Sequence, residues 1–313
     1  QLEAVTAPDG PVLVIAGAGS GKTRTIVHRL AWLAEQGVPA SDMLLLTFTR
    51  KASREMLLRA TDLLGYSIGG VHGGTFHSFA FSVLRQYRPA WAEGPVTVMD
   101  SADSASAIQQ CKERLKVGKG DRSFPKTQTI IGLLSKARNK EISIGDVLQR
   151  DAQRLLPHAD ALASIGEAYR GYRRQHGLLD YDDLLFELED LLKGDPEAGR
   201  EGLAERFRER YRYIMVDEYQ DTNRVQARLV RLLAGEAGNV MAVGDDAQSI
   251  YAFRGADVRN ILDFPKLFPG TRVIRLEENY RSTQPVLDVA NAVLAPASEG
   301  FRKNLFTTKE NTP

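Results

Sequence analysis

The chain has 313 residues, more than one typical domain, and its 43% hydrophobic content and formal net charge of +1 are ordinary for a globular protein. Its single cysteine excludes an intrachain disulfide and a cysteine metal cluster. No apolar run approaches the roughly 18 residues of a membrane span, and no signal peptide is evident, so a membrane or secreted protein is not expected and a cytoplasmic location is predicted.

A glycine-rich loop follows the first predicted strand. The apolar run 11–15 is expected to form a buried parallel strand, and the periodic segment 25–33 a helix. Between them, positions 16–23 read AGAGSGKT, a Walker A pattern with Ala16 where the strict form has Gly. In such a loop backbone N–H groups approach phosphate oxygens, Lys22 can reach the β- and γ-phosphates, and Thr23 can bind Mg²⁺. This context predicts a phosphate-binding loop rather than an incidental glycine-rich turn.

Residues suited to single-stranded nucleic acid follow the second predicted strand, 43–47. Phe48 could stack on a base and Arg50 could contact a phosphate, although a core Phe beside solvated basic residues is an equally good interpretation. Residues 71–79 are expected to be a short strand that breaks into a helix. They include His72 and His77, but no third ligand has suitable spacing, so no metal site is predicted there.

Strand signals fade from about residue 82 to about residue 206, and this predicts a helical insertion in an α/β domain. Helical periodicity is clearest in segments 102–115, 127–137, 159–175 and 181–192. The excess of basic residues between 112 and 140 could attract a phosphate backbone or form a solvated helix face. Asp180 is interpreted as a helix N-cap with Asp182 and Asp183 in the first turn, because the loop lacks the Gly and Glu of a Ca²⁺ site.

Acidic and amide side chains follow the strands predicted after this insertion. Asp217 and Glu218 come directly after strand 213–216, in the Walker B arrangement in which one carboxylate holds Mg²⁺ and the next orients or deprotonates water. Capping of the next helix is the alternative. Strand 240–244 precedes Gln248, which lies where a γ-phosphate sensor would, and strand 272–276 follows. The alternation of strands and helices predicts an α/β fold with a doubly wound, mainly parallel sheet.

Taken in order, these motifs resemble those of the UvrD/Rep/PcrA-type superfamily 1 DNA helicases. The segments that carry the resemblance are Gln1 with Ala4 and Val5, AGAGSGKT at 16–23, TFTRKA at 47–52, GTFHS at 74–78, VDEYQDTN at 216–223, VGDDAQSIYAFRGA at 243–256 and LEENYRS at 276–282. The resemblance implies a first RecA-like P-loop NTPase domain at 1–84 and 207–276, with a helical insertion domain at 85–206. It also implies that residues 277–313 begin a truncated second RecA-like domain.

The resemblance implies an ATP-dependent DNA helicase or translocase, moving 3′→5′, with ATP and Mg²⁺ as cofactors. Its expected partners are single-stranded DNA, duplex junctions and repair or replication proteins. The implied nucleotide contacts are Gln1 on adenine, Arg24 and Tyr280 on either side of the base, and Gly17, Ala18, Gly19, Ser20, Gly21, Lys22 and Thr23 on the phosphates. The implied catalytic residues are Glu218 as base and Lys22, Gln248 and Arg281 at the phosphates, with Thr23 and Asp217 on the metal. The implied DNA contacts are Phe48, Arg50, Thr75, His77, Tyr251, Phe253 and Arg254.

Two positions depart from the family pattern: Arg50 stands where Asn is usual, and Phe253 where Trp is common. The arginine finger of the second RecA-like domain is not in this chain, so the fragment alone is expected to be poorly active. A non-catalytic docking module that keeps the fold is the alternative function. A small-molecule kinase or GTPase would leave segment 245–255 and Tyr280 unexplained.

Overall fold

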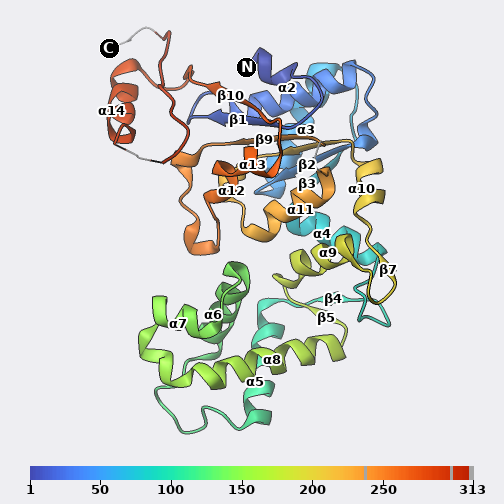
Figure 1. The fold of residues 1–313 in the computed structure, drawn as a ribbon, viewed down its shortest axis with the longest axis vertical. Coiled ribbons are helices and arrows are strands. Elements are labelled where there is room, and N and C mark those ends of the chain that lie inside the picture. The colour runs from blue at the N-terminus through green and yellow to red at the C-terminus, as the bar shows by residue number, and fades with distance from the viewer. Residues whose placement is uncertain (236–237, 297–298, 310–313) are drawn as a thin grey trace. The chain divides into compact units, whose positions relative to one another are not determined.

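The computed structural model describes residues 1–235, 238–296 and 299–309, with the side chain of Arg254 left out. Its contacts divide the chain into two compact units. The first, here called the α/β unit, comprises Gln1–Ser78 and Arg200–Pro313, and the second, the helical unit, comprises Phe79–Gly199. Figure 1 shows the elements of both units.

The α/β unit is built on a six-stranded sheet in which every pair of neighbouring strands is parallel. Its strand order is β10-β1-β9-β8-β2-β3. The strands are β1 (Val12–Ala16), β2 (Met43–Thr47), β3 (His72–Thr75), β8 (Tyr213–Val216), β9 (Asn239–Gly244) and β10 (Arg272–Leu276). The predicted α/β class and mainly parallel sheet are therefore confirmed.

Helices cover the two faces of this sheet, so every residue of β1, β2 and β8 is buried. On one face Val14, Leu45 and Met215 pack with Ile26 and Leu30 of α2 in a single core cluster. Figure 1 shows α2 and α3 on one side of the sheet and α11 on the other. The helices of this unit are α1 (Leu2–Val5), α2 (Lys22–Glu35), α3 (Arg50–Leu64), α10 (Ala204–Arg210), α11 (Arg224–Ala234), α12 (Arg259–Leu262), α13 (Phe264–Leu267) and α14 (Gln284–Leu294).

The register of the strands brings their carboxyl ends to one edge of the sheet. Ala16 pairs with Leu276, and Thr47 pairs with Thr75. Val216, the last residue of β8, lies beside Leu46 and beside Ala242 of β9. The loops that follow these strands therefore emerge together, which is where ligands bind in open parallel sheets.

The helical unit has its own apolar core, which includes Ile108, Ile130, Val147, Leu162 and Ile165. Its elements are α5 (Ser101–Leu115), α6 (Thr127–Lys140), α7 (Ile144–Asp151), α8 (Ala159–Gln175) and α9 (Asp183–Lys193), with short strands β4 (Thr97–Val98), β5 (Leu178–Leu179) and β6 (Gly194–Asp195). Two elements lie at its borders, α4 (Phe76–Gln86) and β7 (Arg200–Glu201). The predicted helices 102–115, 127–137 and 159–175 are confirmed, whereas α7 was not foreseen.

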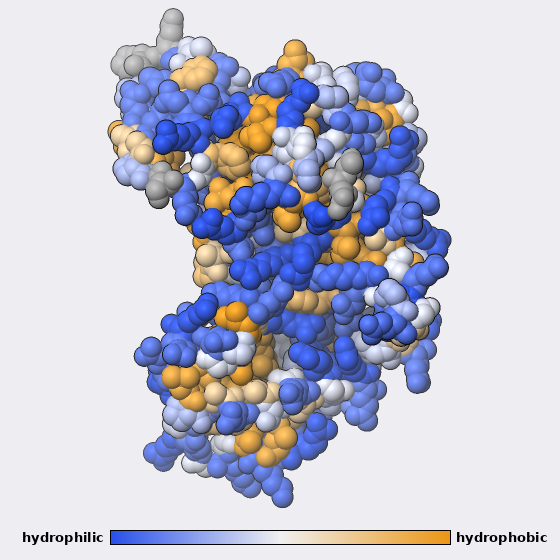
Figure 2. All heavy atoms as spheres, viewed as in Figure 1, coloured by the Kyte–Doolittle hydropathy of each residue, from blue (hydrophilic) through white to orange (hydrophobic). Residues whose placement is uncertain are grey.

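Within the described residues, none of the helices has both the length and the apolar character needed to cross a membrane. Figure 2 shows that hydrophilic residues cover most of one face of the molecule, with apolar residues scattered in small groups. Exposed apolar residues are ordinary on a protein surface, because apolar atoms make up more than half of the accessible area of a folded protein.

Candidate functional site

The glycine-rich loop joins β1 to α2 as a tight turn. The Ser20 hydroxyl and the Ser20 N–H both donate to the Gly17 carbonyl, at 2.7 and 3.2 Å. Gly19 and Gly21 have φ angles of 76° and 93°, in the left-handed region that L side chains avoid. Gly21 directly precedes α2, so the loop leads its backbone N–H groups into the helix N-terminus. This is the geometry in which a helix start binds a phosphate group.

Lys22, the first residue of α2, connects three of the predicted site residues. Its Nζ lies 3.1 Å from Glu218 Oε2 and 3.2 Å from Gln248 Oε1. The Lys22 side chain is 11% exposed, so its ammonium group is held in a largely dry environment between a carboxylate and an amide. Residues that are about 200 positions apart in the sequence therefore meet at the carboxyl edge of the sheet.

Two carboxylates that follow β8, those of Asp217 and Asp221, have raised pKa values. Burial, and then the neighbouring Glu218 carboxylate, raise the pKa of Asp217 to about 7, although Lys22 lowers it. The same two causes raise the pKa of Asp221 to about 6. Within the described part of the chain, one buried oxygen of each carboxylate has no hydrogen-bond partner. A cation would satisfy these oxygens, because carboxylate oxygen is the ligand type that Mg²⁺ prefers.

Thr23 and Asp217 both line a cavity of about 700 Å³ beside the loop, together with Glu218 and Gln248. Thr23 and Asp217 are compatible with the predicted magnesium site, because both residues line this cavity and carry hydroxyl or carboxylate oxygens of the kind that Mg²⁺ prefers. The backbone of Glu218 has φ 48°, a left-handed conformation that is rare for a residue with a side chain. Such strain concentrates at functional positions.

Segments from both chain ends contact the glycine-rich loop. The Gln1 amide donates to the Ser20 carbonyl at 2.8 Å, and the Tyr280 N–H donates to the Gly19 carbonyl at 3.0 Å. The hydrogen bond from Tyr280 to Glu278 raises the pKa of the Tyr280 phenol, and the exposed Arg24 lies close enough to oppose that shift in part. The structure thus brings Gln1, Arg24 and Tyr280 to one rim of the loop.

Arg281 is also at this rim, but its side chain is exposed. Its Cβ lies only 2.8 Å from where a Cβ on Gly19 would be, and its N–H donates to Asn279 Oδ1 at 2.8 Å. Asn279 in turn donates to the Ala18 carbonyl, so the segment after β10 is attached to the loop by hydrogen bonds at Ala18 and Gly19. Asn279 was not among the predicted site residues, although it lies in segment 276–282, because its contact is a hydrogen bond to a backbone carbonyl that only the tertiary fold brings near.

Three predicted DNA contacts form a ladder of aromatic rings. The ring centroids of Phe48 and Tyr251 are 5.2 Å apart, and those of Tyr251 and Phe253 are 5.8 Å apart. Phe48 is 44% exposed and Phe253 is 68% exposed. Phe48 and Tyr251 also line the cavity that contains Glu218 and Gln248. Two exposed rings with a half-buried ring between them, at this spacing, suit base stacking. The interpretation of Phe48 as a core residue is wrong, because its ring is open to solvent.

The remaining predicted DNA contacts are not part of this ladder. Arg50 lines a different cavity of about 500 Å³. Thr75 exchanges hydrogen bonds with Ser78 at the start of α4, its Oγ1 accepting from the Ser78 N–H at 3.1 Å. His77 is partly buried, and burial lowers its pKa to about 4. The side chain of Arg254 lies outside the described residues.

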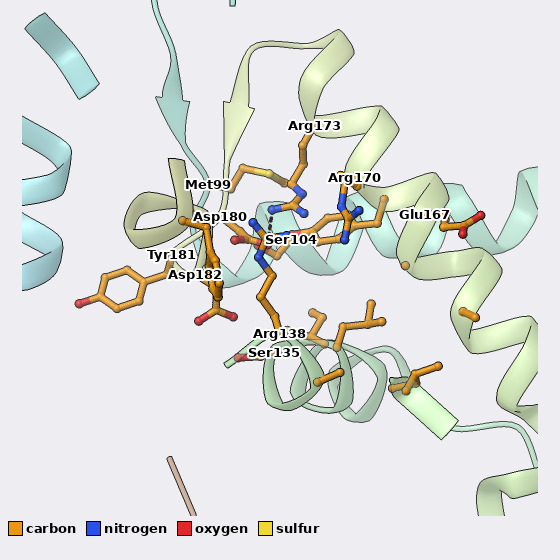
Figure 3. Close-up of a pocket in the computed structure, with 18 of the residues that line it drawn as sticks. Met99, Ser104, Ser135, Arg138, Glu167, Arg170, Arg173, Asp180, Tyr181 and Asp182 are labelled. Carbon is orange, nitrogen blue, oxygen red and sulfur yellow. Dashed lines mark ion pairs between the residues drawn. The ribbon is translucent and has the colours of Figure 1, made fainter. Parts of the chain in front are cut away.

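A further cavity, of about 660 Å³, lies in the helical unit (Figure 3). Buried Arg173 pairs there with Asp180 and Asp183, and Arg138 lies 3.4 Å from Asp183 Oδ1. The first-turn interpretation of the three aspartates is therefore incomplete, because Asp183 is buried in an ion-pair cluster. Asp180 Oδ1 does accept from the Asp183 N–H at 2.8 Å, but the helix begins at Asp183 and Asp182 is the residue that precedes it.

Comparison with known proteins gives a consistent result. The family model described as the UvrD/REP helicase N-terminal domain matches residues 1–269. The chain is 39% identical to a protein of Staphylococcus epidermidis and 40% identical to one of Staphylococcus aureus, both named ATP-dependent DNA helicase PcrA. These matches cover 98% and 99% of the chain and 41% of each relative. The chain thus spans about two fifths of the length of these curated relatives.

Proposed function

Because the chain belongs to the UvrD/REP helicase family, we propose that it is the ATP-binding N-terminal part of an ATP-dependent DNA helicase. The observation that carries this proposal is that Lys22 contacts both Glu218 and Gln248. Asp217, the residue before Glu218, has a buried oxygen without a hydrogen-bond partner among the described residues. A phosphate loop cation, a water-activating carboxylate and an amide in one pocket are the parts that phosphoryl transfer to water requires.

In this proposal the triphosphate lies on the loop from Gly17 to Thr23, with Lys22 on its β- and γ-phosphates. Lys22 exchanges its present contacts with Glu218 and Gln248 for phosphate oxygens, which leaves Glu218 free to accept a proton from the attacking water. Gln248 and Arg281 are assigned to the γ-phosphate. Gln1 is assigned to the adenine edge, and Arg24 and Tyr280 to the faces of the base.

Thr23 and Asp217 would hold Mg²⁺, which when bound neutralises charge on the phosphate oxygens. The raised pKa of Asp217 supports this assignment, because a carboxylate buried next to Glu218 is more stable beside a cation than alone. Asp221 lines the same cavity and was not among the predicted ligands. Because it also has a buried oxygen without a hydrogen-bond partner in the described part of the chain, Asp221 would be a second acidic residue available to a bound Mg²⁺.

The DNA strand is assigned to the ladder of Phe48, Tyr251 and Phe253. Stacking on exposed rings is worth about 1–3 kcal/mol per base and tolerates any base sequence, as a translocase requires. Phe48 and Tyr251 line the same cavity as Glu218. A base that moves along these rings would therefore shift side chains next to the proposed hydrolysis site. Arg50, Thr75, His77 and Arg254 remain assigned to the DNA path from the family resemblance, as does the 3′→5′ direction.

We further assign residues 1–84 and 207–276 to a first RecA-like domain, 85–206 to the helical insertion domain, and 277–313 to the start of a second RecA-like domain. Closure of two such domains on ATP would drive stepping along single-stranded DNA or at a duplex junction. Repair or replication proteins are the partner class expected from the resemblance.

The test is ATP hydrolysis by the full-length protein, with and without single-stranded DNA, for the unchanged protein and for Lys22→Ala. We expect DNA to stimulate hydrolysis, and Lys22→Ala to abolish it without loss of folding. Lys266→Ala is the matched control, because Lys266 pairs with Asp263 on the surface and lies outside the segments that carry the family resemblance. Nucleotide binding without hydrolysis in the unchanged protein would favour the docking module, and hydrolysis that ignores DNA would contradict the helicase assignment.

A further inference from the structure

A buried ion pair joins the segment after α14 to the loop after β9. Lys303 Nζ contacts Asp245 Oδ1 and lies 3.4 Å from Asp246 Oδ1. The side chains of Lys303 and Asp245 are only 4% and 3% exposed. Two charges taken out of water in this way depend on each other, because either one alone would remain buried without compensation.

The other oxygen of Asp245 holds the amide of Gln248. Asp245 Oδ2 accepts from Gln248 Nε2, while the Ala247 N–H donates to Oδ1 at 3.1 Å. A carboxylate can only accept hydrogen bonds, so the NH₂ group of Gln248 must face Asp245. The carbonyl oxygen of Gln248 is thereby turned toward Lys22 Nζ, 3.2 Å away.

The segment that carries Lys303 is attached to the site at several points. The Phe301 N–H donates to Asp246 Oδ2 at 3.2 Å. Leu305 is buried against the glycine-rich loop, because a Cβ placed on Gly17 would lie 2.6 Å from Leu305 Cδ2. Asn291 of α14 exchanges two hydrogen bonds with the backbone of Leu305, at 2.8 and 2.9 Å. The ammonium group of Lys303 is therefore presented to Asp245 by a fixed backbone.

We propose that Lys303 is a positioning residue for the nucleotide site, holding the Asp245 carboxylate so that it accepts one N–H of the Gln248 amide and leaves the second N–H to donate to the γ-phosphate. This inference rests on the proposed function, since it assumes that a nucleoside triphosphate occupies the glycine-rich loop. It extends that function by making γ-phosphate recognition depend on a residue 55 positions beyond Gln248 in the sequence. In this proposal, Gln248 is correctly oriented only when segment 300–306 is docked against the loop after β9.

The experiment compares binding of fluorescent ADP and of a fluorescent, non-hydrolysable ATP analogue to the 313-residue chain. We expect Lys303→Met to lower the preference for the ATP analogue by about tenfold, which is a change of about 1.4 kcal/mol in ΔG, and to leave ADP affinity within about twofold. A merely structural role would weaken both nucleotides alike. Lys266→Met is the matched control, since Lys266 pairs with Asp263 on the surface and is 81% exposed.

Two further variants make the result specific. Lys303→Arg, which keeps the charge, is expected to restore most of the preference. In a Gln248→Ala background, Lys303→Met is expected to change the preference by less than about twofold, because coupled residues act on one step. If Lys303→Met does not fold, Lys303→Gln takes its place, because it keeps a hydrogen-bond donor for Asp245 but loses the charge. An unchanged preference for the ATP analogue in Lys303→Gln would overturn the inference.

The possible failures are distinguishable. A wild-type chain that binds neither nucleotide would overturn the proposed function, and with it the premise of this inference. A wild-type chain that binds both nucleotides equally, or a Lys303→Met variant that keeps the full preference, would overturn the role of Lys303 alone. Equal weakening of ADP and ATP analogue by Lys303→Met would also overturn that role.

Discussion

Glu218 combines a left-handed backbone conformation with a carboxylate that contacts Lys22, so hydrolysis should depend strongly on it. Glu218→Gln keeps the shape of the side chain but removes the proton acceptor, so hydrolysis by the full-length protein should fall about 10²–10⁴-fold. Nucleotide binding should persist, because Lys22 and the loop are unchanged. Glu55→Gln is the control, as Glu55 lines the same cavity but pairs with Arg59. Steady-state ATPase rates and a binding titration check this, and equal rates for both variants would contradict the assignment.

His77 should make the stability of the chain depend on pH. Burial lowers the pKa of His77 in the folded chain to about 4, whereas an exposed histidine has a pKa of about 6.5, so the unfolded state binds a proton first as the pH falls. The stability is fully present above pH 6.5 and is lost as the pH falls toward 4. By linkage this amounts to about 2 kcal/mol between pH 7.5 and pH 5. Urea unfolding of the unchanged chain and of His77→Gln at both pH values measures it, and parallel pH profiles would show the expectation to be wrong.

At the scale of elements, the strands were predictable and the links between distant loops were not. Strands 213–216 and 272–276 were predicted with the bounds that the structure gives, because their apolar runs are buried in a parallel sheet. The proximity of Lys22, Asp217 and Gln248 was also predictable, since each follows a parallel strand and the carboxyl ends of such strands lie at one edge of the sheet. Lys303 and Asn279 could not be found in this way, because each acts through a partner fixed only by the tertiary fold.

The glycine-rich loop should be sensitive to side-chain volume as well as to backbone strain. Gly19→Ala places a Cβ at φ 76°, 2.7 Å from Asn279 Nδ2 and 2.8 Å from Arg281 Cβ. Gly37→Ala is the matched control, with φ 82° and open space around the added Cβ. Left-handed strain alone should cost Gly37→Ala about 1–2 kcal/mol of unfolding free energy. Overpacking should cost Gly19→Ala about 1–3 kcal/mol more. Equal urea midpoints for the two variants would argue against close packing at the loop.

At the scale of the whole molecule, the division into two units implies that each stabilises itself. The apolar cluster of the helical unit draws its members from positions 99 to 169, all inside Phe79–Gly199. The sheet cluster draws its members from Ala4 to Val71 and from Tyr213 to Leu276. A core that is complete within its own unit should not need the other unit to fold, since burial of apolar area supplies most of the stability. The helices at 102–115, 127–137 and 159–175 were predictable because their periodicity marks the apolar faces that pack into the core of the helical unit.

The helical unit can therefore be tested alone. Residues 79–199, produced as a separate chain, should unfold in one cooperative transition followed by circular dichroism. Leu162→Ala should cost about 2–5 kcal/mol, because Leu162 is fully buried in that core. Leu156→Ala, at a site that is 39% exposed, should cost much less. If the unit is autonomous, both values should match those in the 313-residue chain within about 0.5 kcal/mol. A broad transition, or a Leu162→Ala cost that appears only in the longer chain, would mean that the α/β unit holds the helices in place.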